Sequence, residues 1–527
     1  MDSKQVDQLM RQAVEALNTG DYRTLQQLCN QILNLDKNRA DAWFFMSLVA
    51  DAGRRPDHAL KFIDRALKLI PDHVEYLTQK AKLHSLLNHY SEALETAELA
   101  SRARPDQAIV LDTLGVVYTR LGKYQQAREL LQRAVDRTPE NPQFQFNLGS
   151  AEQFLGNETA ARVAYRSAIK LKPDFCRAYW ALSELEKDQP EPGRLNDLLT
   201  LQASCSDSAD RLYLSHAISR EYEKRGQYRN AFDCLAAGKQ QRKAQLHYSV
   251  ETDLALFKTL EETFSRSPPR PAENDALNGR AIFIVGMPRT GTTLLDRIVS
   301  SHSRVTSLGE LQEFPRAVKK IAGTGSSLVL DNESVSKAAM AEMHEIAAVY
   351  RNMLGDRIPT DKRFIDKLPL NFLTVGFIIN ALSEARVICL RRNALDTCLS
   401  NFRQLFALNF SYYNYHYDLA DTARFYVAFD SLMKFWQLSF PDRFHQINYE
   451  NLVDNPENSV REIMDYLALE WEPGCLNFHT SNEPVATASA SQVRRPLYRD
   501  SVARWKKYAE FLQPAMEILD QAGIEYR

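Results

Sequence analysis

Small apolar residues in the amino-terminal part of the chain recur with a fixed period. Two series of alanines and one series of prolines each advance in steps of 34 residues. The series are Ala59, Ala93, Ala127 and Ala161; Ala66, Ala100, Ala134 and Ala168; and Pro71, Pro105, Pro139 and Pro173. A period of this length, with small residues where helices cross and a proline closing every second helix, predicts helix pairs. Because one pair cannot cover its own apolar face, the pairs should stack into a solenoid.

The period resembles that of the tetratricopeptide repeat, and Gly-x-Tyr turns such as Gly122-Lys123-Tyr124 strengthen the resemblance. We assign residues 1–245 to the solenoid, with the clearest repeats at about 40–187. A degenerate first repeat is expected around 18–22, and a detached last one around 226–231, after an irregular stretch at 188–208. The concave surface is a candidate docking site for a protein or peptide. A scaffold or dimerisation arm is an equally good interpretation, and an oligomer is compatible with either.

The pattern changes beyond a proline-rich break. The prolines of Ser267-Pro268-Pro269-Arg270-Pro271 exclude a helix and indicate a linker or domain entry, which we place at 246–280. From residue 281 onward, short apolar runs such as 281–285, 386–390 and 444–448 alternate with helical patterns. This alternation predicts an α/β domain with a parallel sheet at 281–527. Motifs that follow its strands should converge on one crevice beyond the carboxyl ends of the strands.

Composition limits the partners and the compartment. The 65 basic and 67 acidic residues among 527 give a net charge of −2, so no global field attracts nucleic acid. The seven cysteines are scattered and form no Cys-x-x-Cys pair, which argues against zinc sites and a disulfide framework. No apolar stretch approaches the roughly 18 residues of a membrane helix, and no signal-peptide core follows Met1. We therefore expect a cytoplasmic protein without membrane insertion, whose anion sites are local.

The first apolar run of the α/β domain is followed by Gly286-Met287-Pro288-Arg289-Thr290-Gly291-Thr292-Thr293. The glycines have the spacing of the phosphate loop G-x-x-x-x-G-K-[ST], whose backbone N–H groups surround an anion at a helix start. Thr292 replaces the lysine that reaches the terminal phosphates of a nucleoside triphosphate, and Arg289 supplies a positive charge three residues earlier. The loop therefore predicts a sulfuryl donor. An unrelated Gly-Pro turn and a degenerate NTPase loop are the alternatives.

A second candidate anion site follows the run at 386–390. Arg392 stands at the predicted strand end, and Ser400 lies eight residues later, a little over two helical turns away. The guanidinium fork and the hydroxyl could then hold one phosphate together. Two arginines at a helix start more often belong to a solvated edge, so the phosphate interpretation depends on the neighbouring loop.

Together the two motifs resemble the donor site of sulfotransferases. Residues 288–293 are similar to their 5′-phosphosulfate loop, and Arg392 with Ser400 to their 3′-phosphate site. Segments 448–453, 487–496 and 504–505 are similar to those of tyrosylprotein sulfotransferases and of bacterial relatives that carry tetratricopeptide repeats. The resemblance covers about 275–527, and in the bacterial relatives also the repeats. It implies a P-loop-like sulfotransferase domain that uses 3′-phosphoadenosine-5′-phosphosulfate as its co-substrate.

The resemblance also implies roles for individual residues. Glu310 would be the general base, with Lys367 and Arg289 as further catalytic groups. The implied donor contacts are Arg289, Thr290, Gly291, Thr292, Thr293, Arg392, Ser400, Tyr449, Ser489 and Arg504. Arg504 stands where the tyrosylprotein enzymes have lysine, and Thr290 where the eukaryotic ones have serine. Their peptide-recognition region has no visible match, which puts tyrosine as the acceptor in doubt.

The implied reaction is in-line sulfuryl transfer. A carboxylate removes the proton of the acceptor hydroxyl while cationic groups hold the sulfuryl oxygens and the departing phosphate. Because a sulfuryl group carries less negative charge than a γ-phosphoryl group, we expect no metal ion.

Several of these residues also have a structural interpretation. Glu310 could stabilise the first turn of a helix that begins near Leu311, and Lys367 could be a surface lysine. His302 is the rival base, although packing or capping is its simpler role. The aromatic run at 412–417 either lines an acceptor gate or packs on the domain.

Three functions compete. The first is a sulfotransferase acting on a hydroxyl of protein tyrosine, a saccharide or a small metabolite. The second is a P-loop kinase or another NTP-binding enzyme. The third is a repeat-based interaction protein with an inactive nucleotide domain, against which intact Glu310, Lys367, Arg392 and Ser400 argue.

Overall fold

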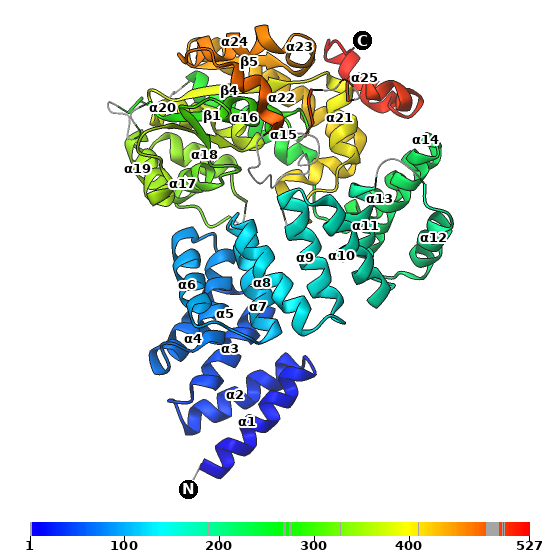
Figure 1. Cartoon of the computed structure of the whole chain (residues 1–527). Helices are drawn as coiled ribbons and strands as arrows, with labels where there is room; N and C mark the ends of the chain where they lie inside the picture. Colours follow the sequence, from blue (N-terminus) through cyan, green and yellow to red (C-terminus); the bar gives the residue numbers. More distant parts are fainter. Residues whose placement is uncertain are drawn as a thin grey trace. The chain divides into compact units, whose positions relative to one another are not determined.

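The chain divides into two compact units, Met1–Ala178 and Tyr179–Arg527, in a computed structural model (Figure 1). The division falls inside helix α11 (Cys176–Leu185) rather than near residue 245, the expected end of the solenoid. The structure describes residues 3–186, 190–266, 270–272, 277, 279–326, 328–408, 410–480, 495–497, 499 and 501–526.

The first unit consists of stacked helix pairs, as the 34-residue period predicts. All eight alanines of the two series are fully buried, and each proline of the third series follows within three residues of the second helix of its pair. An additional pair precedes the regular ones, joined by a turn in which Gly20 has φ +72°. The helices are α1 (Ser3–Asn18), α2 (Tyr22–Leu35), α3 (Ala40–Ala52), α4 (Pro56–Leu69), α5 (Val74–Leu86), α6 (Tyr90–Arg102), α7 (Ala108–Arg120), α8 (Tyr124–Arg137), α9 (Pro142–Leu155) and α10 (Glu158–Leu171).

The second unit begins with helices that sequence patterns alone did not assign to it. They are α12 (Arg194–Ser204), α13 (Ser208–Lys224), α14 (Tyr228–Lys243) and α15 (Val250–Arg266). The stretch at 188–208 is therefore partly helical, and the expected linker at 246–280 contains a helix of 17 residues. These helices belong to the second unit because they bury aromatic side chains in it. Phe232 of α14 stacks on Phe402 and Phe511, and Phe264 of α15 packs edge-on against Phe377 and Trp436.

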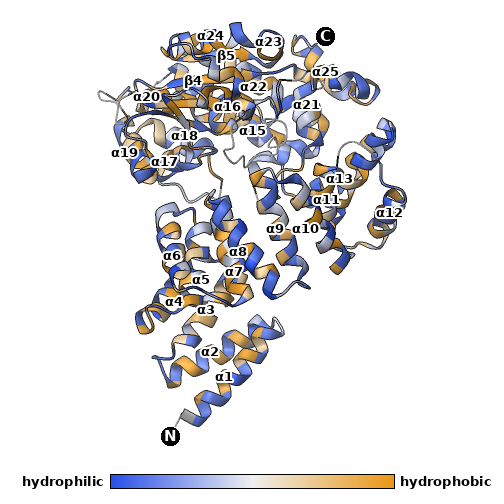
Figure 2. Cartoon of the chain, in the orientation of Figure 1, coloured by the Kyte–Doolittle hydropathy of each residue, from blue (hydrophilic) through white to orange (hydrophobic). Residues whose placement is uncertain are grey.

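The core of the second unit is a parallel sheet of five strands, as predicted from the alternating apolar runs. The strands are β1 (Ala281–Val285), β2 (Val305–Ser307), β3 (Arg363–Lys367), β4 (Arg386–Arg391) and β5 (Phe444–Asn448). Their order in the sheet is β2-β3-β1-β4-β5, and every neighbouring pair is parallel. The central strand β1 is completely buried, and the strands appear hydrophobic in Figure 2. A strand buried on both faces has to be apolar at every position, which explains the run Ala-Ile-Phe-Ile-Val.

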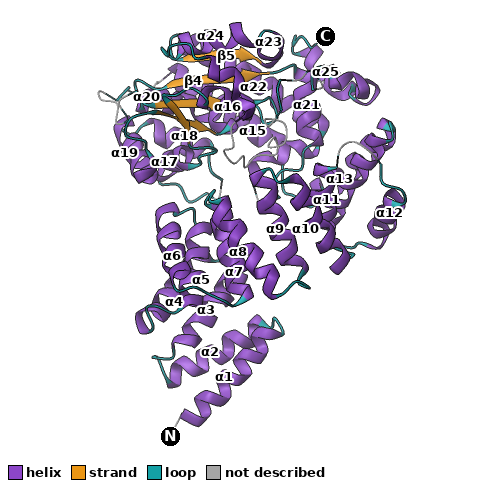
Figure 3. Ribbon diagram, in the orientation of Figure 1, coloured by secondary structure: helices purple, strands orange, loops and turns teal. Residues whose placement is uncertain are grey.

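Helices cover both faces of the sheet (Figure 3). Alternate residues of β1 enter different apolar clusters: Phe283 and Val285 pack on one side, and Ile282 and Ile284 on the other. The remaining helices are α16 (Thr292–Ser300), α17 (Glu313–Ala322), α18 (Asn332–Ala339), α19 (Met343–Leu354), α20 (Val375–Ala381), α21 (Ala394–Arg403), α22 (Leu419–Ser439), α23 (Tyr449–Asp454), α24 (Pro456–Tyr466) and α25 (Gln513–Gln521). Short 3₁₀ segments are η1 (Gly355–Arg357), η2 (Pro369–Thr374), η3 (Ser411–Tyr417), η4 (Pro473–Thr480) and η5 (Arg504–Phe511).

Candidate functional site

A site residue predicted from the sequence lies at or just beyond the carboxyl end of every strand. These are the loop 286–291 after β1, Glu310 after β2, Lys367 at the end of β3, Arg392 after β4 and Tyr449 after β5. Because the five strands are parallel, their carboxyl ends share one edge of the sheet. From β1 the chain first adds strands on one side of the sheet and then on the other. In open α/β sheets, ligands bind in the crevice beside the strand at which this direction reverses.

Only glycine fits at the two glycine positions of the loop after β1, because a larger side chain would collide with neighbouring residues. Gly286 has φ +150°, and a Cβ atom there would lie 2.6 Å from the carbonyl oxygen of Leu390. Gly291 has φ +105°, and its Cβ would lie 2.7 Å from the ring of Tyr449. The loop is thus clamped between β4 and α23 before its chain enters α16.

The threonines of this loop differ in their surroundings. The Thr290 hydroxyl donates a hydrogen bond to the carbonyl of Met287 at 2.8 Å, and the side chain is 1% exposed. Its hydroxyl therefore shapes the loop from inside. Thr292 and Thr293 are the first two residues of α16 and are also buried. Their backbone N–H groups belong to the helix start, where an anion is favoured.

The segment after β4 holds the same loop through two successive carbonyls. Arg392 Nη1 donates to the carbonyl of Arg289 at 3.1 Å, and Asn401 Nδ2 donates to that of Pro288 at 2.7 Å. The Arg392 guanidinium also lies 5.1 Å from the centre of the Tyr449 ring. Its Nε atom is buried and has no hydrogen-bond partner among the described residues. An unsatisfied buried donor of this kind is uncommon and costly.

A cavity of about 320 Å³ unites most of the predicted donor contacts. Its lining includes Arg289, Gly291, Arg392, Ser400, Tyr449 and Arg504. Among the described residues, seven cationic side chains and three carboxylates line it: Arg220, Lys224, Arg289, Arg392, Arg403, Arg495 and Arg504 against Glu184, Glu186 and Glu223. We call it the arginine-rich cavity. Its excess of positive charge suits a ligand with more than one anionic group.

Glu223 of α13 organises the arginines at one wall of this cavity. Its carboxylate accepts hydrogen bonds from Arg403 Nε at 2.7 Å, from Arg220 Nη1 at 3.2 Å and from the Tyr508 hydroxyl, and Arg504 Nη2 lies 3.4 Å away. Burial alone would raise the pKa of Glu223, but the surrounding guanidinium groups and the Tyr508 hydroxyl lower it well below its usual value. The carboxylate is therefore ionised, and it offsets the repulsion among the arginines that surround it.

Arg504 is the least buried member of this group. The Arg403 guanidinium, and after it burial, lowers the pKa of Arg504 to about 10, which still leaves it charged at neutral pH. Ser489, the remaining predicted donor contact, lies outside the described residues.

Glu310 and Lys367 form an ion pair at the ends of β2 and β3. Lys367 Nζ lies 2.6 Å from Glu310 Oε1; the Lys367 side chain is 1% exposed and that of Glu310 40%. The interpretation of Lys367 as a surface lysine is therefore wrong. Helix α17 starts at Glu313 with Gln312 as its N-cap, so the first-turn carboxylate is Glu313. Glu310 precedes the cap, and its structural interpretation is wrong as well.

The neighbours of Lys367 fix the position of its backbone. Lys367 pairs with Ile284 of β1, two residues before Gly286, and the N–H of Gly286 donates to the carbonyl of Pro369 at 3.1 Å. Asp366 is fully buried and accepts a hydrogen bond from the Tyr350 hydroxyl at 2.8 Å. The end of β3 and the start of the loop are thus one rigid unit.

His302 lies two residues beyond the end of α16, and its ring contacts other parts of the chain. Its Nε2 lies 2.9 Å from the carbonyl of Glu470, and its Nδ1 accepts from the N–H of Arg304 at 3.1 Å. Both ring nitrogens are used in packing this helix end, which confirms the simpler role given to His302.

The aromatic run at 412–417 divides into a buried part and a partly exposed part. Tyr415, His416 and Tyr417 are buried, whereas Tyr412 and Tyr413 are partly exposed. The Tyr412 hydroxyl accepts a hydrogen bond from Gln312 Nε2 at 3.2 Å. Burial first, and then the charge of Glu310, raises the pKa of Tyr412 above its ordinary value, which keeps this phenol neutral beside the ion pair.

Sequence patterns missed the residues that reach the site from elsewhere in the chain. Arg220 and Glu223 lie more than 60 positions before the loop, on a helix whose pattern indicated only a repeat. Asn401 and Arg403 could have been selected from the sequence, because they follow Ser400 in the last turn of α21.

The comparisons with known proteins agree with this architecture. Residues 281–473 match the model of the sulfotransferase family, and residues 75–140 and 113–174 match models of the tetratricopeptide repeat. The chain carries a sulfotransferase-family domain behind tetratricopeptide repeats. The recognition from the phosphate loop and the 34-residue period is thereby confirmed.

Two relatives and one solved structure illustrate the likeness. An uncharacterised protein of Aquifex aeolicus (strain VF5) is 32% identical over 309 residues, which are 57% of this chain and 40% of that protein. The protein-tyrosine sulfotransferase of Drosophila melanogaster is 23% identical over 236 residues, 42% of this chain and 46% of that enzyme. The sulfotransferase domain from the curacin biosynthetic pathway is 17% identical with a TM-score of 0.32, covering 47% of this chain and 98% of the domain. The chain spans less than half the length of the two relatives.

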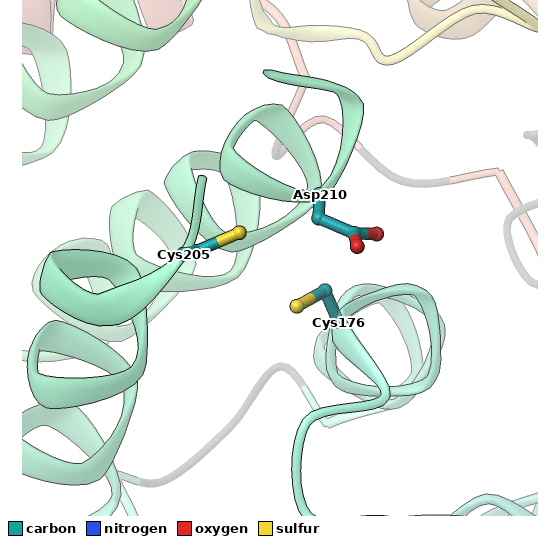
Figure 4. A group of neighbouring side chains, drawn as sticks. All are labelled: Cys176, Cys205 and Asp210. Atoms are coloured by element: carbon teal, nitrogen blue, oxygen red, sulfur yellow. The ribbon is translucent and has the colours of Figure 1, made fainter. Parts of the chain in front are cut away.

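Cys176, Cys205 and Asp210 are drawn in Figure 4. Cys176 belongs to the first unit, where its thiol lies 3.3 Å from the carbonyl of Asp174. Cys205 caps α12, and Asp210 lies in the first turn of α13, both in the second unit. Because the group is divided between the units, it defines a metal site in neither. Within the described ranges, no helix is long and apolar enough to cross a bilayer.

Proposed function

We propose that the second unit is a sulfotransferase that moves the sulfuryl group of 3′-phosphoadenosine-5′-phosphosulfate to an acceptor hydroxyl. The observation that carries the proposal is the arginine-rich cavity, in which the phosphate-loop residues Arg289 and Gly291 meet Arg392 and Ser400. Two separate anion sites in one cavity suit a donor with a 5′-phosphosulfate and a 3′-phosphate. The absence of a lysine at Thr292 makes a nucleoside triphosphate the poorer fit.

The proposed roles follow from the positions of the side chains. Arg289, Gly291, Thr292 and Thr293 would hold the 5′-phosphosulfate at the start of α16, with Thr290 shaping the loop. Arg392 and Ser400 would hold the 3′-phosphate, since both line the arginine-rich cavity. Tyr449 would pack beside the nucleotide, and Arg504 and Ser489 would add further contacts.

The bond changes would be those of in-line transfer. The acceptor oxygen forms a bond to sulfur as the bond between sulfur and the 5′-phosphate oxygen breaks, and Glu310 takes the proton of the acceptor. Lys367 supplies the positive charge that stabilises the departing phosphate. The products are a sulfate ester and adenosine 3′,5′-bisphosphate. Glu310 suits the role of base because its side chain reaches solvent while its partner Lys367 does not.

The repeats and the acceptor are part of the same proposal. Tetratricopeptide repeats commonly bind peptides or proteins, so the first unit would dock a protein partner. Protein tyrosine is one acceptor that the likeness to the Drosophila enzyme suggests. We place the reaction in the cytoplasm and without a metal ion, as the sequence led us to expect.

Incubation of the full chain with ³⁵S-labelled donor and a cell lysate tests the proposal. We expect label in an acceptor, and no label with the variant Glu310→Gln. Addition of EDTA should leave the transfer unchanged. Binding of Mg-ATP with phosphoryl transfer, and no sulfuryl transfer, would contradict the proposal in favour of a kinase.

A further inference from the structure

A second cavity, of about 730 Å³, is lined by sequence neighbours of Glu310 and Lys367, although neither of these two residues lines it. Its wall contains Leu368, which directly follows Lys367, and Gln312, two residues beyond Glu310. Tyr412, which accepts the hydrogen bond of Gln312, lines it as well. The cavity therefore lies near Glu310, the residue proposed to take the proton of the acceptor, because the charge of Glu310 acts on Tyr412 in the cavity wall. Its volume lies within the range of about 300–1,000 Å³ that is usual for small-molecule sites.

The wall of this cavity is mostly apolar, and we call it the apolar cavity. It is contributed by α15, α17, α18 and the loop before it, η2, η3 and α22. Its apolar side chains include Leu256, Phe257, Leu328, Leu330, Leu370 and Phe425. Leu328-Val329-Leu330 is a run of three apolar residues in a loop, and Leu328 is 36% exposed. A ligand that covers such a surface gains free energy from the apolar area that it removes from water.

Most carboxylates of this wall already have a cationic partner within the chain. Three of its four carboxylates form ion pairs within the chain, at 2.6 to 3.0 Å: Glu251 with Arg424, Asp331 with Lys319 and Glu333 with Lys337. The fourth, Asp253, accepts a hydrogen bond from the Tyr248 hydroxyl at 2.7 Å. Burial raises the pKa of Asp253 to about 6, which disfavours its charged form. No lysine or arginine stands among the described residues that line the cavity.

One polar acceptor in the wall is left unsatisfied. Asn371 is 1% exposed and donates from Nδ2 to Asp366 at 3.3 Å, while its Oδ1 atom has no hydrogen-bond partner among the described residues. Buried polar atoms without a partner are uncommon and call for a ligand group or a water molecule. The apolar cavity thus offers a large apolar surface, with the Asn371 amide enclosed in its wall.

We propose that the apolar cavity binds the body of the acceptor, and that the acceptor is an uncharged, largely apolar small molecule with a hydroxyl group. The inference rests on the proposed sulfotransfer and specifies its substrate class. An anionic acceptor would lose its hydration without finding a lysine or arginine among the described residues of the wall, which is costly. An acidic tyrosyl peptide in particular would bring carboxylates to a wall that has no described cation to receive them.

Binding to the cavity can be tested without turnover. N-phenyl-1-naphthylamine, an uncharged apolar fluorophore, should bind the full chain and be displaced by 4-octylphenol. The variant Leu328→Glu should weaken its binding about tenfold, because the new carboxylate has to be desolvated. Leu438→Glu is the matched control, since Leu438 lies on α22 outside the cavity and is 82% exposed. Equal affinity of Leu328→Glu and the control for the fluorophore would overturn the proposal.

Transfer from labelled donor to two acceptors tests the substrate class. We expect kcat/KM for 4-octylphenol to exceed that for an acidic tyrosyl peptide, and Leu328→Glu to raise the KM for the phenol without changing the affinity for adenosine 3′,5′-bisphosphate. Preference for the peptide would overturn this inference and leave sulfotransfer intact. If the bisphosphate does not bind and neither acceptor is labelled, the proposed function itself fails. If the bisphosphate binds but neither acceptor is labelled, the fluorophore measurement decides whether the apolar cavity binds apolar ligands. Weaker binding by Leu328→Glu than by the control then supports this inference, and equal binding overturns it.

Discussion

Lys367 Nζ lies 2.6 Å from Glu310 Oε1, and the two side chains differ sharply in exposure, at 1% and 40%. The ammonium group is enclosed by the sheet edge, whereas the carboxylate reaches solvent. The ion pair holds Glu310 at the carboxyl end of β2 although no regular element surrounds it. It also joins the residue proposed to accept the proton to the residue proposed to stabilise the leaving group.

Replacement of Glu310 by glutamine should remove the base and keep the shape of the side chain. We expect kcat to fall by about 10²- to 10⁴-fold, the usual contribution of general acid–base catalysis. The affinity for adenosine 3′,5′-bisphosphate in calorimetry should stay unchanged, because Glu310 does not line the arginine-rich cavity. Glu345→Gln, on the exposed face of α19, is the matched control. Ordinary turnover by Glu310→Gln would refute the assignment of the base.

The variant Lys367→Met should lose turnover by about 10²-fold, since it removes the charge that stabilises the departing phosphate. The fold should tolerate the change, because methionine fills the buried space and the deserted Glu310 carboxylate is 40% exposed. Single-turnover kinetics with saturating donor measure the effect, with Lys362→Met as the control. A fall in thermal stability that accounts for the whole loss of activity would contradict a role in the chemistry.

Ser400→Ala should weaken binding of adenosine 3′,5′-bisphosphate by roughly tenfold, as expected when one hydrogen bond to a charged group is lost. Binding of adenosine 5′-monophosphate, which lacks the 3′-phosphate, should not change. Titration calorimetry with both nucleotides gives the comparison, and Ser336→Ala on α18 serves as the control. Equal losses for the two nucleotides would show that Ser400 does not contact the 3′-phosphate.

Glu223 predicts a pH dependence of stability. Its pKa is lowered in the folded chain, so its contribution to the free energy of unfolding is complete above about 4.5, its usual value, and is lost as the pH falls below that value. At pH 7, Glu223→Gln should destabilise the chain by about 3–5 kcal/mol, the usual cost of leaving buried charges unpaired. The difference in Tm between Glu223→Gln and the unmodified chain should be constant from pH 6 to 8 and should shrink on acidification. A difference that grows in acid would contradict this account.

Much of the fold followed from local patterns in the sequence. The 34-residue period located the helix pairs because small residues are required at every helix crossing, and the apolar run 281–285 located the central strand because it is buried on both faces. The boundary of the second unit could not be predicted from these local patterns. Phe232 and Phe264 sit on helices whose patterns resemble any amphipathic helix, and only their partners Phe402 and Trp436 reveal where they pack.

The candidate site likewise contains residues that could be predicted from the sequence and residues that could not. Arg289, Arg392 and Ser400 could be selected because their chemistry is carried by short segments next to strands, and the structure brings them into one cavity. Glu223 and Asn371 could not be selected from the sequence. The role of Glu223 depends on Arg403, which is far away in the chain, and that of Asn371 depends on a buried oxygen without a partner among the described residues. The same holds for the apolar cavity, whose wall is assembled from elements that lie far apart in the chain.

Titration calorimetry of the full chain with adenosine 3′,5′-bisphosphate, and separately with Mg-ATP, tests the central claim most directly. If the loop after β1 and the Arg392–Ser400 pair form one donor site, the bisphosphate should bind in a one-to-one ratio and much more tightly than Mg-ATP, and Ser400→Ala should reduce this preference. Tight binding of Mg-ATP together with no binding of the bisphosphate would contradict the account.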